Sequence, residues 1–230
     1  MLLRILILGS LSCCAFGGVV YFSGSDPGVG FGEARPNSDA AHSSFLAALG
    51  ANFVVIDFEG QPAASPAAVM NLGFGVTYTP SQPDSSSGIF TTNDTIRGYN
   101  TTVGGTTHLR YSSSTADNLD AVFSFASPIS AFGAYFTGVG TSGGAATILF
   151  SDGTQFSTTL TDQDSGGVQF FGFTDFGNSI SAVTVRGNTA DIFGIDDVTL
   201  DATVPEPSTL LTALPLAGLL LVRLARRRRG

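Results

Sequence analysis

Residues 121–137 read AVFSFASPISAFGAYFT and carry the clearest β pattern in the chain. Side chains alternate between the two faces of a strand, so in 121–126 the odd positions point one way and the even positions the other. The odd set contains Ala121, Phe123 and Phe125, whereas the even set includes Ser124. A second strand is predicted over 129–137. This alternation favours two packed sheets, each with one buried face and one wet face.

Short apolar runs recur on both sides of this stretch, separated by Gly, Ser, Asn and Asp. Further strands are predicted over 53–59, 74–79, 107–111, 145–150, 154–160, 168–173, 180–185 and 191–200. An Asp-Gly pair at 152–153 lies between two of these runs and predicts a tight hairpin. Strands of this number and length predict an all-β fold, a sandwich or a barrel, and we favour a jelly-roll-like β-sandwich.

One short helix is predicted before the strands, over residues 39–49. Residues 37–39 are N-cap candidates, apolar residues at 45, 46 and 49 have helical spacing, and Gly50 is a natural stop. Residues 19–36 are Gly-rich with little pattern, which predicts a flexible leader. The predicted sandwich domain therefore covers 37–201.

The charge of the chain excludes one class of partner. Between residues 26 and 201 there are 17 acidic residues against four arginines, a net charge of −13, and the 230-residue chain has no lysine. Such a surface repels nucleic acid and attracts divalent cations. Nineteen phenylalanines and no tryptophan supply the core.

The N-terminus has the pattern of a secretory signal peptide over residues 1–18. Arg4 is followed by an apolar stretch and then by small residues at a candidate cleavage site. The two cysteines, Cys13 and Cys14, lie inside this segment, so the exported protein would contain no thiol or disulfide. A lipoprotein signal that uses one of these cysteines is the alternative.

The C-terminus reads VPEPSTLLTALPLAGLLLVRLARRRRG from residue 204 to residue 230. A helix over 208–225 would span about 27 Å, close to the thickness of a hydrocarbon core. The arginines after it would stay on the cytoplasmic side of a membrane. Residues 202–230 therefore predict a membrane segment, and a plain tail anchor is one reading of it.

The order of motif, helix and basic tail also resembles the PEP-CTERM sorting signal of Gram-negative bacteria. The motif residues are Val204, Pro205, Glu206, Pro207 and Ser208, and the basic tail is Arg223, Arg226, Arg227, Arg228 and Arg229. The resemblance implies that an exosortase at the inner membrane recognises the motif and removes the tail. It implies a destination at the cell surface or in an exopolysaccharide matrix.

Two distant acidic stretches open and close the β region. Asp57 and Glu59 lie at the end of the first predicted strand, and Asp196 and Asp197 interrupt the last, where the parity of the apolar residues slips and predicts a β-bulge. A bulge can turn carboxylates toward one point, as Ca²⁺ requires. The stretches also resemble jelly-roll carbohydrate-binding modules, in which an early Glu and a late Asp often hold a structural calcium. The resemblance implies Glu59 with Asp197 or Asp196 as calcium ligands, while ordinary turn and cap roles stay open.

The sequence offers little for catalysis. His42 and His108 are predicted to be surface imidazoles, and no nucleophile or phosphate-loop motif occurs. Asp57 and Glu59 share one face of a strand at a spacing that a glycosidase could use. We therefore predict a non-catalytic, exported surface or biofilm-matrix protein, with a calcium-stabilised glycan-binding module and a polysaccharide hydrolase as alternatives. For glycan contact the candidate aromatic residues are Tyr78, Tyr99, Tyr111 and Tyr135.

Overall fold

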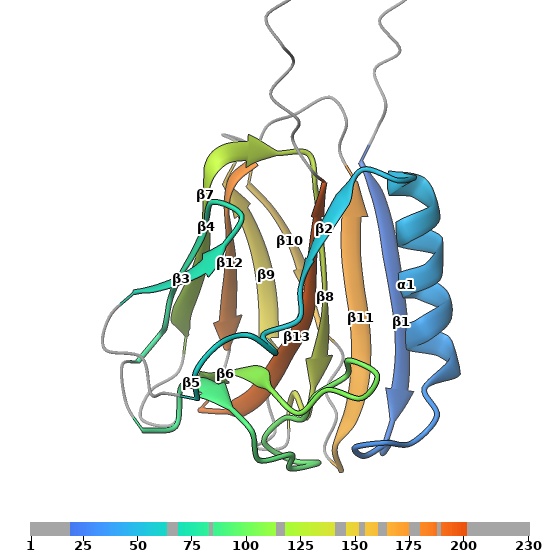
Figure 1. Ribbon diagram of the computed structural model, residues 1–230, viewed down its shortest axis with the longest axis vertical. Helices are drawn as coiled ribbons and strands as arrows, with labels where there is room; N and C mark the ends of the chain where they lie inside the picture. The colour runs from blue at the N-terminus through green and yellow to red at the C-terminus, as the bar shows by residue number, and fades with distance from the viewer. Residues whose placement is uncertain are drawn as a thin grey trace, which may run out of the picture.

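The chain folds into a β-sandwich with one helix on its outside (Figure 1). This computed structural model describes residues 19–63, 69–82, 85–113, 118–140, 146–151, 155–160, 165–174, 180–187 and 190–201. The strands of both sheets pair antiparallel throughout these ranges. The predicted all-β sandwich with one short helix is confirmed.

The first sheet has the order β1-β11-β8-β13-β6-β5, and β2 also pairs with β13. Its strands are β1 (Val20–Pro27), β2 (Phe53–Ile56), β5 (Gly88–Phe90), β6 (His108–Ser112), β8 (Ala131–Thr137), β11 (Gly167–Thr174) and β13 (Ile192–Asp201). The first predicted strand and the last one therefore lie side by side. We call this sheet A.

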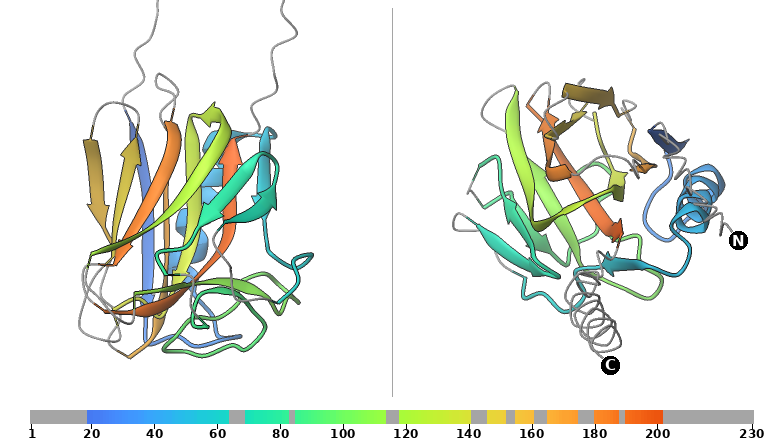
Figure 2. Two further views of the ribbon diagram at one scale, coloured as in Figure 1. Left: turned by 90° about the vertical axis from the view of Figure 1, so that its left-hand side faces the viewer. Right: turned by 90° about the horizontal axis from the view of Figure 1, so that it is seen from above.

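The second sheet, sheet B, has the order β10-β9-β12-β7-β4-β3. Its strands are β3 (Met70–Gly73), β4 (Val76–Thr79), β7 (Leu119–Ile129), β9 (Ala146–Ser151), β10 (Gln155–Thr159) and β12 (Ile180–Gly187). Figure 2 shows the two sheets as separate layers, with β7 and β12 crossing in front of sheet A.

The main core lies between the sheets and is built largely from phenylalanine. Phe123 of β7 packs 5.7 Å from Phe132 of β8, and Phe150 of β9 packs 4.2 Å from Phe173 of β11, as ring centroids. The predicted alternation in β7 is confirmed, because Phe123 is fully buried while Ser124 is partly exposed. Each buried ring contributes on the order of 2 kcal/mol.

A second, smaller core lies between sheet A and the helix α1 (Pro36–Leu49). Helix α1 lies on the outer face of sheet A (Figure 2), and its Phe45 packs against Phe170 of β11. A Cβ on Gly133 of β8 would lie 2.8 Å from the Phe45 ring. Glycine at this position therefore lets the helix approach the sheet closely.

The start of α1 is held by β1 and not by the predicted caps. Asp26 of β1 accepts the backbone amides of Asn37 and Ser38, which satisfies helix N-terminal donors from outside the helix. The helix begins at Pro36, three residues before the predicted start. Its predicted end is confirmed, because Gly50 has a φ of 70° and its amide donates to Leu46 O.

Two expectations about the strands were wrong. Residues 19–36 do not form a flexible leader, because β1 pairs with β11 along its whole length. The strand predicted over 74–79 is the second half of a hairpin whose turn, at Phe74 and Gly75, has positive φ at both residues. Hydrophobic patterning assigns an exposed phenylalanine to a strand, so it does not detect this turn.

The predicted signal peptide at 1–18 and the sorting segment at 202–230 lie outside the described residues. Within the described ranges, no helix has both the length and the apolar character that crossing a bilayer requires.

Candidate functional site

The predicted bulge lies where β13 changes partner. The first half of β13 pairs with β6 and the second half with β2. Its register with β8 shifts between Asp196 and Thr199, and Asp197 has a φ of 48°. The bulge is confirmed, and it returns Ile195 and Val198 to the same core although their positions differ in parity.

The two carboxyl groups of the bulge accept hydrogen bonds from one loop. Asp196 is fully buried, and its Oδ2 accepts the backbone amides of Thr101 and Thr102. Asp197 accepts the Thr102 hydroxyl at 2.6 Å and the Thr101 hydroxyl at 3.0 Å. The Thr101 hydroxyl also lies 2.9 Å from Asp196 Oδ2.

The Thr101 hydroxyl lies between the two carboxyl groups, within hydrogen-bond distance of both. Burial raises the pKa of Asp196 well above its ordinary value, and the adjacent Asp197 carboxylate raises it further. Burial and the neighbouring charge therefore both favour the protonated form of Asp196.

Glu59 grips the other end of the same loop. Its Oε1 accepts the backbone amides of Thr106 and Thr107 at 2.8 Å each, and the Asn100 side-chain amide at 2.8 Å. Burial by itself would raise the pKa of Glu59, but the bonds from Thr107 and Thr106 outweigh it and hold the pKa below its ordinary value. Asp57 accepts the Glu59 amide, as in a local turn.

Three of the predicted calcium ligands thus accept hydrogen bonds from one loop, namely Glu59, Asp196 and Asp197. In the part of the chain that the structure describes, no group of three or more acidic, histidine or cysteine side chains could hold a metal ion. Glu59 Oε1 accepts three N–H donors, so this oxygen is used as a hydrogen-bond acceptor and is not free to bind a metal ion. Two other oxygens suit a hard cation better. Asp196 Oδ1 and Asn100 Oδ1 are buried and have no hydrogen-bond partner among the described residues.

A groove runs between α1 and the loop formed by residues 99–105. Two adjoining hollows of about 420 Å³ and about 320 Å³ make up this groove, which we call the α1 groove. Both hollows are lined by Arg35, Asp39, Thr101, Thr102 and Val103. Asp197 lines the smaller hollow, so this carboxyl group, which binds the loop, is also part of the groove wall.

The floor of the groove is a polar network centred on Asp39. Its Oδ1 accepts Arg35 Nε at 2.8 Å and the Tyr135 hydroxyl at 2.8 Å. His42 Nδ1 lies 3.1 Å from the same hydroxyl, and the Arg35 guanidinium lies 4.7 Å from the centroid of the Tyr135 ring. The Asp39 side chain is half exposed, so this network faces solvent.

The rims of the groove are apolar and exposed. Phe31 lines the larger hollow from the segment that joins β1 to α1, with 49% of its surface exposed. Val103 stands at the tip of the facing loop and is 97% exposed. We expected no phenylalanine to serve as a ligand platform, so Phe31 was missed. The Gly-rich surroundings of Phe31, from Gly28 to Gly32, are the signal that could have marked it as a loop residue.

The aromatic residues predicted to contact glycans are all buried. They are Tyr78, Tyr99, Tyr111 and Tyr135, none more than 2% exposed. Their hydroxyls serve internal bonds where a partner is present, such as Tyr111 to Leu119 O and Tyr99 to Val29 O. His108, predicted at the surface, is also fully buried.

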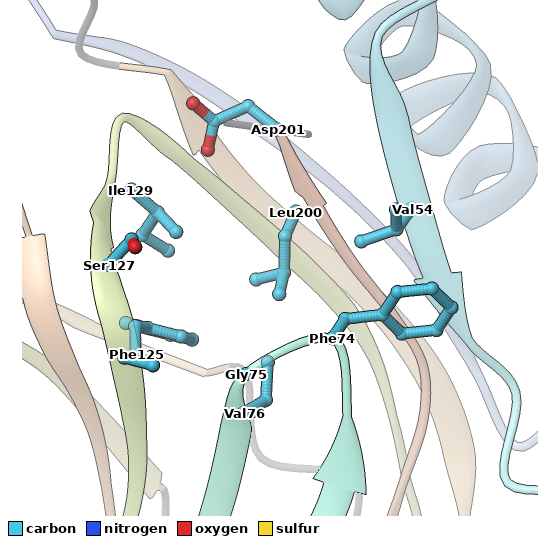
Figure 3. Close-up of a pocket in the computed structure, with 10 residues that line it drawn as sticks. Val54, Phe74, Gly75, Val76, Phe125, Ser127, Ile129, Leu200 and Asp201 are labelled. Atoms are coloured by element: carbon cyan, nitrogen blue, oxygen red, sulfur yellow. The ribbon is translucent and has the colours of Figure 1, made fainter. Parts of the chain in front are cut away.

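A third hollow, of about 280 Å³, lies at the opposite side of β13 between β2, β4 and β7 (Figure 3). Its walls are apolar side chains such as Leu200 and Phe125, and its one acidic group is Asp201. Asp201 already accepts the amides of Ser130 and Ala131. The other polar side chain that lines this hollow is Ser127, so the hollow has fewer polar groups for recognition than the α1 groove, where we place the candidate site.

Comparison with known proteins finds only distant structural similarities. No family model matches the chain, and no curated protein matches it. Among solved structures, two mutants of a module described as a family 29 carbohydrate-binding module match at 14% identity, with TM-scores of 0.38 and 0.37. Each alignment covers 66% of this chain and 93% of the module. The cleaved adhesin domain of Lys-gingipain also matches at 14% identity, with a TM-score of 0.43, over 66% of this chain and 98% of that one.

Proposed function

We propose that the protein is a non-catalytic, exported surface or matrix protein whose sandwich binds a glycan in the α1 groove. The observation that carries this proposal is the combination of apolar rims, at Phe31 and Val103, with a polar floor at Arg35 and Asp39. Sugar rings present apolar C–H faces and hydroxyl edges, so they need both kinds of surface. An exposed aromatic ring beside fixed polar groups provides them.

The test uses the full-length chain in detergent and a panel of oligosaccharides, with binding measured by titration calorimetry. Phe31→Ala should weaken binding about tenfold or more, because a lost aromatic contact costs about 1–2 kcal/mol. Phe74→Ala is the matched control, since Phe74 is 69% exposed at the β3–β4 turn and outside the groove. A protein that binds no glycan, or that loses binding equally in both variants, would contradict the proposal.

The hydrolase alternative has less support. Glu59 would have to supply a proton or a nucleophilic oxygen, but its Oε1 is occupied by three N–H donors. Its lowered pKa also opposes a role as general acid, which needs a raised one.

Export and sorting belong to the same proposal. The chain would cross the inner membrane with its signal peptide, pause at the helix predicted over 208–225, and be released when an exosortase removes the tail. The resemblance at Val204 to Ser208, followed by the apolar run and the arginines, supports this route. Mass spectrometry of the C-terminus in the native host tests it. Loss of residues 210–230 is the expected result, and an intact tail in the inner membrane would overturn it.

We also propose a structural calcium at the bulge, with Asp196 Oδ1 among its ligands. This oxygen is buried and lacks a partner in the described part of the chain, and a hard cation prefers such a donor. Backbone and hydroxyl oxygens would have to complete the shell. After dialysis against EGTA, added Ca²⁺ should raise the Tm of the wild type and leave that of Asp196→Asn unchanged. Equal responses, or no response, would contradict the proposal.

A further inference from the structure

The one cation among the described residues that line the α1 groove is already paired with a carboxylate. Arg35 Nε bonds Asp39, its Nη2 bonds Thr101 O, and its planar face lies over the Tyr135 ring. Among the described residues that line the two hollows, no other side chain carries a positive charge. A ligand carboxylate or sulfate would therefore have to compete with Asp39 for this one counter-charge.

Each hollow of the groove instead contains one buried hydrogen-bond acceptor that receives no hydrogen bond from the described residues. Asn100 lines the larger hollow and is 2% exposed, and its Oδ1 is buried and unpartnered within the described chain. Its amide group is already used, because Nδ2 donates to Glu59 and to Thr107 O. Only the acceptor of this side chain is left.

His42 supplies the acceptor of the smaller hollow. The Tyr135 hydroxyl has a single proton, which it donates to Asp39. The contact with His42 then requires His42 Nδ1 to donate, which fixes the lone pair on Nε2. Nε2 is buried and unpartnered across the residues that the structure describes. Burial lowers the pKa of His42, which keeps the ring neutral and Nε2 an acceptor.

Three carboxyl groups add negative charge around these acceptors. Glu33 and Asp39 line the larger hollow and are exposed, while Asp197 lines the smaller hollow. With Arg35 as the one lining cation, the groove carries an excess of negative charge. An ammonium group matches both features, since it is a cation with three donors and no acceptor.

We propose that the α1 groove selects glycans that carry free primary amines, with Asp39 and Glu33 as counter-ions and Asn100 Oδ1 and His42 Nε2 as hydrogen-bond acceptors. This inference rests on the proposed glycan-binding function and names the class of glycan. Sugars whose amine is acetylated lose the charge and two of the three donors. Uronic-acid polymers are repelled by the same carboxylates.

The deciding experiment compares two ligands that differ in one group. Full-length protein in detergent is titrated with a β-1,4-linked glucosamine hexamer and with its fully N-acetylated form. The free amine should bind at least tenfold more tightly, and its affinity should fall severalfold between about 0.02 M and 0.3 M salt because exposed charges are screened. An oligogalacturonate of the same length should not bind.

Variants locate the effect. Glu33→Gln removes an exposed charge that accepts the Gly30 amide, and it should weaken amine binding roughly fivefold. Asp39→Asn should weaken it further, with circular dichroism to confirm the fold. Asp120→Asn is the matched control, because it removes one carboxylate from β7, where Asp120 pairs with Arg186 outside the groove.

The outcomes separate this inference from the function beneath it. Tight binding of the acetylated or the uronic hexamer, lost in Phe31→Ala, would overturn the amine selectivity and leave the glycan-binding function standing. Binding of the amine that is reduced equally by Asp120→Asn and Glu33→Gln would show attraction to the whole acidic surface and overturn the site. Binding of none of the three would overturn both.

Discussion

Glu59 and Asp196 hold opposite ends of one loop. Glu59 Oε1 accepts the amides of Thr106 and Thr107, while Asp196 Oδ2 accepts the amide of Thr101. The two acids come from the segment after β2 and from the bulge of β13, strands that pair directly. The loop that forms one wall of the α1 groove is thus fixed to the centre of sheet A by two carboxyl groups.

Replacing Glu59 should loosen one end of this loop without unfolding the sandwich. In Glu59→Gln the charge-assisted bonds to Thr106 and Thr107 are lost or weakened. Because Glu59 is exposed, we expect a loss of about 1 kcal/mol in the free energy of unfolding. Hydrogen exchange at the Thr106 and Thr107 amides should quicken markedly. Asp57→Asn, which affects the Glu59 amide alone, should leave those two amides protected.

The same carboxylate gives an acid-sensitive contribution. Its pKa is lowered on folding, so its stabilisation is present above the pKa of the unfolded chain and is lost as the pH falls through the folded value. Between pH 5 and pH 3, wild type and Glu59→Gln should therefore converge in stability. A constant difference across this range would contradict the role of the charge.

Asp196 predicts the opposite pH dependence. Its pKa is raised in the folded state, so the folded protein binds the proton more tightly and loses stability as the pH rises. Asp196→Asn mimics the protonated form and should not show this loss. Measured in EGTA, the variant should gain in Tm relative to wild type as the pH increases from 4 to 8. A gap that narrows over this range would mean that Asp196 is ionised in the fold.

The sequence predicted the sandwich, its one helix and the bulge because each has a local cause. Alternation in β7 and the parity slip at Asp196 and Asp197 are visible within a few residues. The acidic stretches that the sequence marks at both ends of the β region lie beside β2 and in β13, which pair directly. The residues that specify the alternation and the bulge therefore lie within a few positions of these features in the sequence.

The groove could not be predicted in the same way. It depends on where the loop of residues 99–105 lies relative to α1 and the residue before it, as in the bond from Arg35 to Thr101 O, which joins residues 66 positions apart. The helix is in turn placed by β1, a strand whose Gly and Ser residues hide it from pattern analysis. Composition also pointed to tyrosine for glycan contact, although all four of these rings are buried inside the fold.

Close contact between two glycines sets the position of the groove loop. A Cβ on Gly98 would lie 2.2 Å from the backbone nitrogen of Gly194 in β13, and Gly98 has a φ of 110°. Gly98→Ala should therefore displace the loop and cost more than about 3 kcal/mol in unfolding free energy. Gly104→Ala is the matched control, because Gly104 has a φ of 76° with open space around it and should cost only about 1 kcal/mol. Similar losses in the two variants would show that backbone conformation alone, and not the contact with Gly194, requires glycine.

We expect His108 to make a second acid-sensitive contribution to stability, separate from that of Glu59. It is fully buried on β6, and neither ring nitrogen has a hydrogen-bond partner among the described residues. Burial, together with the smaller effect of the neighbouring Arg110 charge, lowers the pKa of His108 to about 4. The unfolded chain takes up this proton near pH 6.5, whereas the folded chain resists it until about pH 4.

The wild type should therefore lose up to roughly 3 kcal/mol of stability through this residue as the pH falls from 6.5 to 4. His108→Gln keeps a neutral polar side chain at every pH, so its stability should depend less steeply on pH across this window. Above pH 7 the two proteins should give parallel curves, because His108 is then neutral in both states. Denaturant unfolding at half-unit pH steps measures the difference. Equal slopes below pH 6.5 would mean that His108 finds a partner for its proton in the folded protein.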